Sequence, residues 1–300
     1  MNTRLLTSAH GTNRAAFSPT DWGLFLGLSA IWGASFLFMA IGLDAFHPGL
    51  VTLLRVGFGA TFMLAIRRTR DVRVERADWA SILLLSVIWV AIPFTLFPLA
   101  QQWIDSGAAG MLNGATPIFT AVVASFLLKQ LPGRIQIAGL ITGFVGIVAI
   151  AVSSSGGERT ALIGVLLVVA ATIGYAFSTN IVAPLQQKYG SIPIMARLLW
   201  VATILVAPYG LYGLEQSRFA WPSLLAVLAV GVLGTGLAFV MMGSLVGSVG
   251  PTRAIFITYL IPVVALILGS VFRDESVVPL AVVGVGLVIA GALLASRSEV

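Results

Sequence analysis

The stretch that decides the fold is MLNGATPIFTAVVASFLL, residues 111–128. It is apolar enough for one helix, yet it contains Pro117, and a proline inside a helix removes a backbone hydrogen bond and clashes with the preceding turn. Pro262 lies in a second apolar stretch of the same kind. Irregular backbone is tolerated in a membrane only where it meets protein or a water-filled cavity. We therefore predict that the two prolines bend two helices near mid-membrane and free the carbonyls of Asn113 and Thr258.

The composition excludes a water-soluble globule. Hydrophobic residues make up 58% of the 300 residues and charged residues only 9%, against about 25% charged in a soluble domain. The lipid bilayer is therefore the expected partner. With no cysteine and only two histidines, neither a disulfide framework nor a thiolate metal site is possible, and no metal or cofactor is expected.

Ten apolar runs have the length of about 20 residues that a spanning helix needs. We predict an all-α integral membrane protein with spans at residues 22–43, 49–66, 80–100, 107–128, 135–153, 161–183, 192–212, 222–244, 252–272 and 276–295. Residues 1–20 form a polar tail without the features of a secretory signal.

The distribution of Lys and Arg predicts the orientation. With the N-terminus in the cytoplasm, twelve of the 17 basic residues fall on the cytoplasmic side and three on the other, as the positive-inside rule requires. Both termini are therefore expected in the cytoplasm, in a bacterial inner (plasma) membrane. The net charge of +6 is thus explained by topology, and nucleic acid is not an expected partner.

The chain also resembles itself. At an offset of 145 residues Pro117 falls on Pro262 and Gly146 on Gly291, and at an offset of 142 Arg55 falls on Arg197. We therefore divide the chain into two five-helix repeats, 21–155 and 160–296. Because five is odd, the second repeat enters the membrane from the opposite side, and such inverted repeats are typical of transporters.

Four segments resemble the EamA-type branch of the drug/metabolite transporter superfamily: IWGASF (31–36), LLRVGFGATF (53–62), NGATPIFTAVVASFLLKQ (113–130) and IAGLITGFVGIV (137–148). The resemblance covers nearly the whole chain. It implies a basket of ten helices around a central cavity, with helices 1–4 and 6–9 lining the cavity and helices 5 and 10 at the periphery. It also implies metabolite export, and within the branch the chain looks most like exporters of aromatic and neutral amino acids.

The charged groups within the spans narrow the substrate. All eleven acidic residues lie in tails, loops or span ends, so no carboxylate is available at mid-membrane to pair with an organic cation or to carry a proton. Only two basic residues, Arg55 and Arg197, lie within spans, too few for a nucleotide sugar. We therefore expect a small neutral or zwitterionic metabolite, moved by alternating access as uniport or exchange.

Aromatic and small polar residues of the spans suit an apolar pocket with a few polar groups. The predicted substrate-binding residues are Trp32, Ser35, Trp89, Phe94, Asn113, Tyr175, Ser178, Thr235, Phe239, Thr258 and Tyr259.

Other interpretations stay open at this point. Arg55 and Arg197 either attract a substrate carboxylate at the two mouths, or they reach the interface or bind carbonyls at helix ends. Pro117 and Pro262 either mark the binding site, improve packing or serve as hinges.

The alternative functions are a channel-like pore and the export of other metabolites or drugs, including organic cations and nucleotide-sugar-like solutes. An enzyme is not expected, because no nucleophile–base pair, acidic dyad or metal set lies at mid-depth. A monomer is expected, with a dimer as the alternative.

Overall fold

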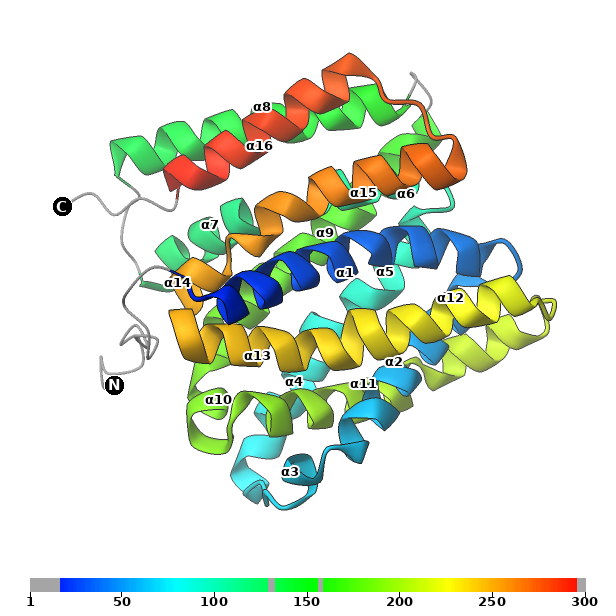
Figure 1. Cartoon of the computed structure of the whole chain (residues 1–300), viewed down its shortest axis with the longest axis vertical. Coiled ribbons are helices and arrows are strands. Elements are labelled where there is room, and N and C mark those ends of the chain that lie inside the picture. The colour runs from blue at the N-terminus through cyan, green and yellow to red at the C-terminus, as the bar shows by residue number, and fades with distance from the viewer. Residues whose placement is uncertain (1–16, 129–132, 156–158, 296–300) are drawn as a thin grey trace.

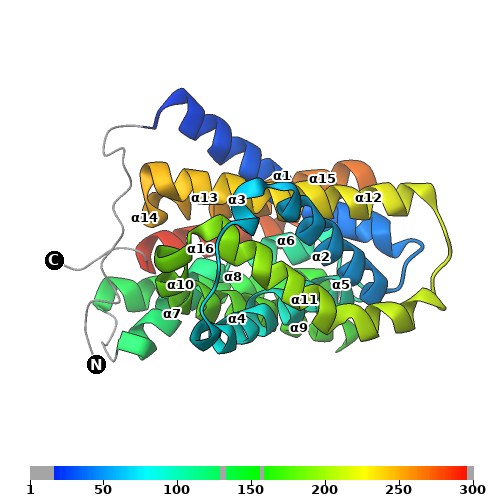
Figure 2. The same cartoon turned by 90° about the horizontal axis from the view of Figure 1, so that it is seen from below.

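The computed structural model describes residues 17–128, 133–155 and 159–295. Within these ranges the chain is helical and contains no strand. The long helices lie side by side (Figure 1). Seen from below, α1, α12, α13 and α15 form one layer, and α4, α7 and α9 lie in a second layer beneath it (Figure 2). Most of the predicted tail, residues 1–20, lies outside the described residues.

Each predicted span contains helix in the structure. The first five spans are α1 (Pro19–Leu43), α2 (Pro48–Ala65), α4–η3–α5 (Trp79–Leu85, Ser86–Ala91, Ile92–Ala100), α6–α7 (Ser106–Asn113, Thr116–Leu128) and α8 (Arg134–Ser155). Two short helices, α3 (Arg67–Arg70) and η2 (Arg76–Asp78), connect the second span to the third.

The second half repeats this order. Its spans are α9 (Arg159–Ile181), α11 (Ser191–Leu214), α12–η4–α13 (Trp221–Gly231, Val232–Leu237, Ala238–Val249), α14–α15 (Pro251–Ala254, Ile257–Arg273) and α16 (Pro279–Ala295). The short helix α10 (Ala183–Tyr189) connects the sixth span to the seventh.

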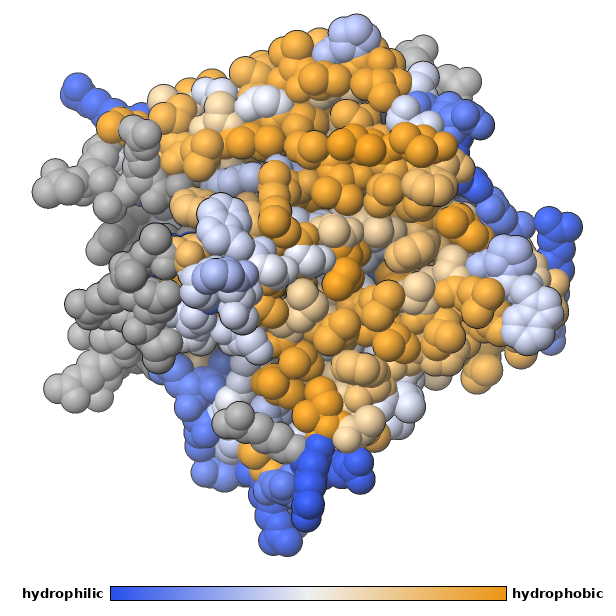
Figure 3. Space-filling model, in the orientation of Figure 1, coloured by the Kyte–Doolittle hydropathy of each residue, from blue (hydrophilic) through white to orange (hydrophobic). Residues whose placement is uncertain are grey.

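The surface confirms that lipid is the solvent. Eight of the described helical stretches are long and apolar enough to cross a membrane, and the helices at Ile257–Arg273 and Pro279–Ala295 are apolar but shorter. At 17 residues each, they still reach the lower limit for a span. Large apolar side chains are exposed along the described spans, including Phe126 (77%) and Ile204 (68%). The face of the molecule in Figure 3 is likewise broadly hydrophobic. In water such a surface would aggregate.

The two repeats run in opposite directions. The start of α1 and the end of α16 lie at one end of the molecule, and α9 follows α8 at the opposite end (Figure 1). The helices pack mainly against helices of the other repeat: α2 against α11, α8 against α16, α6 against α15, α1 against α12 and α15, and α9 against α5 and α7. The fold is therefore held together by the interface between the repeats.

The outer pair, α8 and α16, shows how closely these helices approach. A Cβ added at Gly146 would lie 2.6 Å from the carbonyl oxygen of Gly284, and one at Gly291 would lie 2.4 Å from the amide nitrogen of Gly143. In lipid, where apolar burial supplies no driving force between helices, such close backbone packing stabilises the pair.

The prediction for Pro117 and Pro262 needs a correction. The fourth span is interrupted at residues 114–115, directly before Pro117, which is then the second residue of α7. There its missing N–H costs little. The ninth span is instead interrupted at residues 255–256, and Pro262 lies inside the continuous helix α15. The turn at the start of α15 contains an i→i−3 bond, from Tyr259 N–H to the Phe256 carbonyl. The Pro262 ring instead packs beside Gly114, where an added Cβ would lie 2.5 Å from Pro262 Cγ.

A second pair of irregular segments was not predicted. Both η3 and η4 are π-helical, and they occupy equivalent positions at an offset of 146 residues. Each ends on an i→i−5 bond, from Ile92 N–H to the Val87 carbonyl and from Ala238 N–H to the Leu233 carbonyl. π-Helical turns often occur at functional sites, so these segments direct attention to the residues beside them.

Candidate functional site

Arg55 of α2 is a buried arginine whose side chain contacts three other helices. Its side chain is 6% exposed. Nε donates to Thr235 Oγ1 of η4 at 3.2 Å, Nη1 lies 3.1 Å from Met39 Sδ of α1, and the guanidinium carbon lies 3.9 Å from the centre of the Phe94 ring of α5. Arg55 therefore contacts helices of both repeats.

The Arg55 guanidinium has no acidic partner among the described residues; the ion pairs there join Lys188 to Glu75 and Asp78, and Arg273 to Asp44. A buried cation normally needs a counter-charge. The contacts with Thr235, Met39 and Phe94 are all to neutral groups. The positive charge of Arg55 therefore has no counter-charge among the described residues, and the site suits an anionic group of a ligand.

Two groups of aromatic rings each include a residue of a helix that contacts Arg55. Tyr175 of α9 lies with its ring 6.4 Å from Phe94 and 5.8 Å from Phe97. On the other side, Trp32 and Trp89 each lie 6.3 Å from Phe239, in edge-to-face geometry. Four of these rings come from four different spans and are only partly buried: Trp32, Trp89, Tyr175 and Phe239. Phe94 is the ring that contacts the cation, and Trp32 is joined to Gly234, the neighbour of Thr235 in η4.

The π-helix η4 supplies part of the polar lining. Trp32 Nε1 donates to the Gly234 carbonyl at 3.1 Å. A Cβ added at Gly234 would lie 2.4 Å from Ser35 Oγ. Thr235 Oγ1 donates to the Val230 carbonyl, five residues earlier, while it accepts from Arg55. The irregular backbone thus orients the hydroxyl that holds Arg55.

Seven of the eleven predicted binding residues belong to this network: Trp32, Ser35, Trp89, Phe94, Tyr175, Thr235 and Phe239. The other four have local contacts. Ser178 is fully buried and donates to Gly174 of its own helix, Thr258 donates to Ile255, and the Asn113 carbonyl accepts from Thr116. Tyr259 stacks on Phe256, with the ring centres 5.6 Å apart.

Arg197 and Arg55 have different environments. Arg197 Nη1 donates to the carbonyls of Thr69 (3.1 Å) and Pro193 (2.9 Å), and Nη2 donates to that of Val72. The structure therefore matches the helix-end interpretation for Arg197. Arg55 corresponds to neither interpretation, because it is enclosed by protein and reaches neither a mouth nor the interface.

Polar links close the end of the molecule that we predict to be external. Glu275 accepts from Ser106 N–H (2.9 Å), Ser106 Oγ (2.6 Å) and Gly107 N–H (2.7 Å), and so caps α6 from the other repeat. Arg273 forms a two-bond ion pair with Asp44. Burial raises the pKa of the neighbouring Asp105 carboxyl above its ordinary value, and the charge of Glu275 adds to this rise. A pocket of about 510 Å³ opens at this end, lined by residues 43–48, 102 and 215–218.

The sequence interpretation missed three parts of the site. Met39 lies outside the predicted set because an apolar residue in an apolar helix has no distinguishing mark, and Phe97, an aromatic residue of the third span, is also absent from that set. The π-helices had a weak signal in Pro93, which cannot donate a backbone hydrogen bond, and in the closely spaced Gly234 and Gly236. Glu275 lies in a loop, and nothing near it along the chain indicates its partner on α6.

Comparison with known proteins identifies the family of this fold. The EamA-like transporter family matches residues 22–152 and again residues 162–297. The chain belongs to the EamA-like transporter family. This membership confirms the predicted fold class and the prediction of a multi-pass membrane transporter rather than an enzyme.

Several EamA-like relatives align over most of the chain. A "probable terminal-alkyne amino-acid exporter" of Streptantibioticus cattleyicolor is 26% identical over 93% of this chain and 94% of its own length. "Probable amino-acid metabolite efflux pumps" of Salmonella typhimurium and Escherichia coli are 25% and 24% identical, each over 91% of this chain and 94% of their own. One solved crystal structure has the same fold, with a TM-score of 0.65 at 18% identity over 93% of this chain and 97% of that one.

Proposed function

We propose that this protein exports amino acids with apolar side chains, or closely similar zwitterionic metabolites, across the bacterial inner membrane. The observation that carries the proposal is Arg55, a buried cation without an acidic partner among the described residues. A substrate carboxylate supplies the missing charge, and an arginine binds it through paired charge-assisted hydrogen bonds.

The aromatic rings beside Arg55 support an apolar side chain on the substrate. Phe94 and Tyr175 on one side, and Trp32, Trp89 and Phe239 on the other, offer π surfaces from different spans. No described residue of the network carries a carboxylate, which argues against organic cations, and a single arginine is too few for a nucleotide sugar. The names of the relatives, two of them amino-acid metabolite efflux pumps, point to the same substrate class.

The proposed mechanism is alternating access. Arg55 contacts both repeats, so a rocking of one repeat against the other exchanges its neighbours while a bound carboxylate keeps it neutralised. The links Glu275–Ser106 and Asp44–Arg273 join the two repeats at the predicted external end and must break when the site opens there. The pocket at residues 43–48 and 215–218 would then be the exit. Both termini are proposed to be cytoplasmic, with transport by uniport or exchange.

Counterflow into proteoliposomes tests the substrate class. Labelled phenylalanine, tryptophan and leucine are offered beside an organic cation and a nucleotide sugar, with phenylalaninamide as the matched compound that lacks the carboxylate. We expect saturable uptake of the amino acids, little competition by the amide and no need for an imposed proton gradient. Uptake of the cation with indifference to the amino acids would refute the proposal, and single-channel currents would favour a pore.

A further inference from the structure

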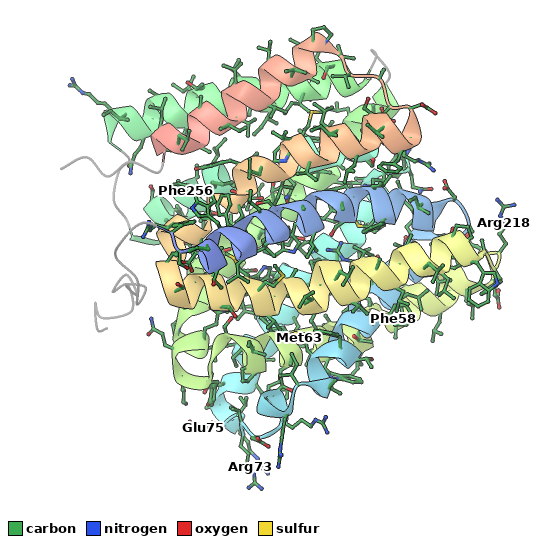
Figure 4. All side chains as sticks on the ribbon, in the orientation of Figure 1. Phe58, Met63, Arg73, Glu75, Arg218 and Phe256 are labelled. Atoms are coloured by element: carbon green, nitrogen blue, oxygen red, sulfur yellow. The ribbon has the colours of Figure 1, made fainter. Side chains whose placement is uncertain are left out.

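The segment between the second and third spans carries an unusual charge. Residues 67–78 contain five arginines and three acidic residues. Four of the arginines, Arg67, Arg70, Arg73 and Arg76, have exposed side chains; we call these four the arginine patch. Arg73 projects from the lower part of the molecule, far from Arg218 (Figure 4).

The backbone beneath the arginine patch is held in place. Arg197 of α11 donates to the carbonyls of Thr69 and Val72. Thr69 Oγ1 donates to the Met63 carbonyl at 3.0 Å, and Val74 packs against the buried cluster that contains Met63. A segment anchored in this way presents its side chains at fixed places on the surface.

Two of the three acidic residues of the segment are bound by residues of α10 instead of by the arginine patch. Lys188 of α10 lies 2.8 Å from Glu75 and 2.9 Å from Asp78, and Tyr189 donates to Asp78 at 2.6 Å. These contacts raise the pKa of Lys188 above its ordinary value, with the bonds to Glu75 and Asp78 as the main causes. Only Asp71 remains, and no described carboxylate pairs with the arginine patch.

The position of the arginine patch matches the level of lipid headgroups. Arg67 follows the last turn of α2 directly, and η2, which contains Arg76, ends where α4 begins with Trp79. Trp79 is 44% exposed, and the next turn of α4 exposes Leu83 and Leu84. An exposed tryptophan at the end of a span marks the membrane interface. The arginine patch therefore lies beside the point where apolar side chains give way to polar ones (Figure 3).

We propose that the arginine patch binds the phosphate headgroups of anionic phospholipids, such as phosphatidylglycerol or cardiolipin. The guanidinium fork matches a phosphate oxyanion bidentately, and basic clusters next to a span attract anionic lipid. The contacts of Arg197 and Lys188 hold the backbone of the segment that carries these four side chains. Lipid binding here is independent of the transported substrate, since the arginine patch and Arg55 share no contact.

Thermal unfolding of the purified full-length protein in neutral detergent tests the proposal. Phosphatidylglycerol should raise the unfolding midpoint and phosphatidylcholine should not. The variant R70Q/R73Q should need roughly 25-fold more phosphatidylglycerol for the same rise, about fivefold for each arginine. R218Q, which removes an exposed arginine at the opposite end, should respond like the wild type.

Two further arms keep the result interpretable. R70K/R73K retains the charge that directs membrane insertion but lacks the fork, so it should also bind the lipid more weakly, and it decides the question if R70Q/R73Q does not fold. Inorganic phosphate at millimolar concentration should have no effect. An equal response of wild type and variants to phosphatidylglycerol, or an equal rise with free phosphate, would overturn the proposal.

Discussion

The second spans of the two repeats carry the same residue and use it differently. Arg55 in α2 and Arg197 in α11 correspond at an offset of 142 residues, and their helices pack against each other across the repeat interface. Arg55 reaches Thr235 of η4. The residue equivalent to Thr235 in η3 is Trp89, whose indole N–H is a donor only. Arg197 therefore finds no acceptor there and binds the carbonyls of Thr69, Val72 and Pro193.

This difference teaches how a duplicated fold acquires one site. The repeats share their helix order, their paired π-helices and their inter-repeat packing, so the backbone alone would give two equivalent positions. The two arginines nevertheless differ: Arg55 is buried and contacts Thr235, whereas Arg197 binds the backbone of the segment that follows α2. We therefore expect Arg55 to be essential for transport and Arg197 for stability.

The largest expected effect is that of Arg55→Gln on transport. Loss of the charge-assisted bonds to a substrate carboxylate, at about 1.5–3 kcal/mol, corresponds to a roughly 10- to 100-fold rise in Kd. The unfolding midpoint should stay the same or rise, because the variant no longer buries an unpaired charge. Counterflow and thermal unfolding of the same preparation measure both quantities. Normal transport by this variant would remove the distinction between the two arginines.

Arg197→Gln should give the reverse result. Its loss leaves the carbonyls of Thr69, Val72 and Pro193 without their donor and releases the segment that carries the arginine patch. We expect a loss of about 3 kcal/mol in the free energy of unfolding, with an unchanged KM for the transported amino acid. The measurements are thermal unfolding and initial rates in proteoliposomes with equal protein content. A changed KM at wild-type stability would assign Arg197 to substrate binding.

The smallest effect concerns a place where the repeats remain alike. Gly146 and Gly291 correspond at an offset of 145, and at each a Cβ would meet backbone of the opposite helix. Gly146→Ala and Gly291→Ala should therefore each cost about 2 kcal/mol of stability through overpacking. Gly286→Ala is the matched control, because nothing lies within 4 Å of its added Cβ, and alanine favours a helix. Thermal unfolding of the three variants compares them; unequal costs at Gly146 and Gly291 would show that this pair has also diverged.

The fold could be predicted almost completely from the sequence. Apolar runs of about 20 residues become helices because no other structure satisfies their backbone in lipid, and this rule depends only on local composition. The same rule explains the close agreement of the helix ends with the predicted spans. The duplicated Pro, Arg and Gly positions indicated the two repeats.

The tertiary structure decided which polar groups meet. The break in the ninth span lies at residues 255–256, away from Pro262, and the proline ring packs beside Gly114 of the other repeat. Arg55 and Thr235 are 180 residues apart in the chain, and Ser106 and Glu275 are 169 apart. The sequence determined that this protein is a duplicated ten-span membrane protein. The contacts of Arg55 depend on how the two halves fit together, and no local pattern records that fit.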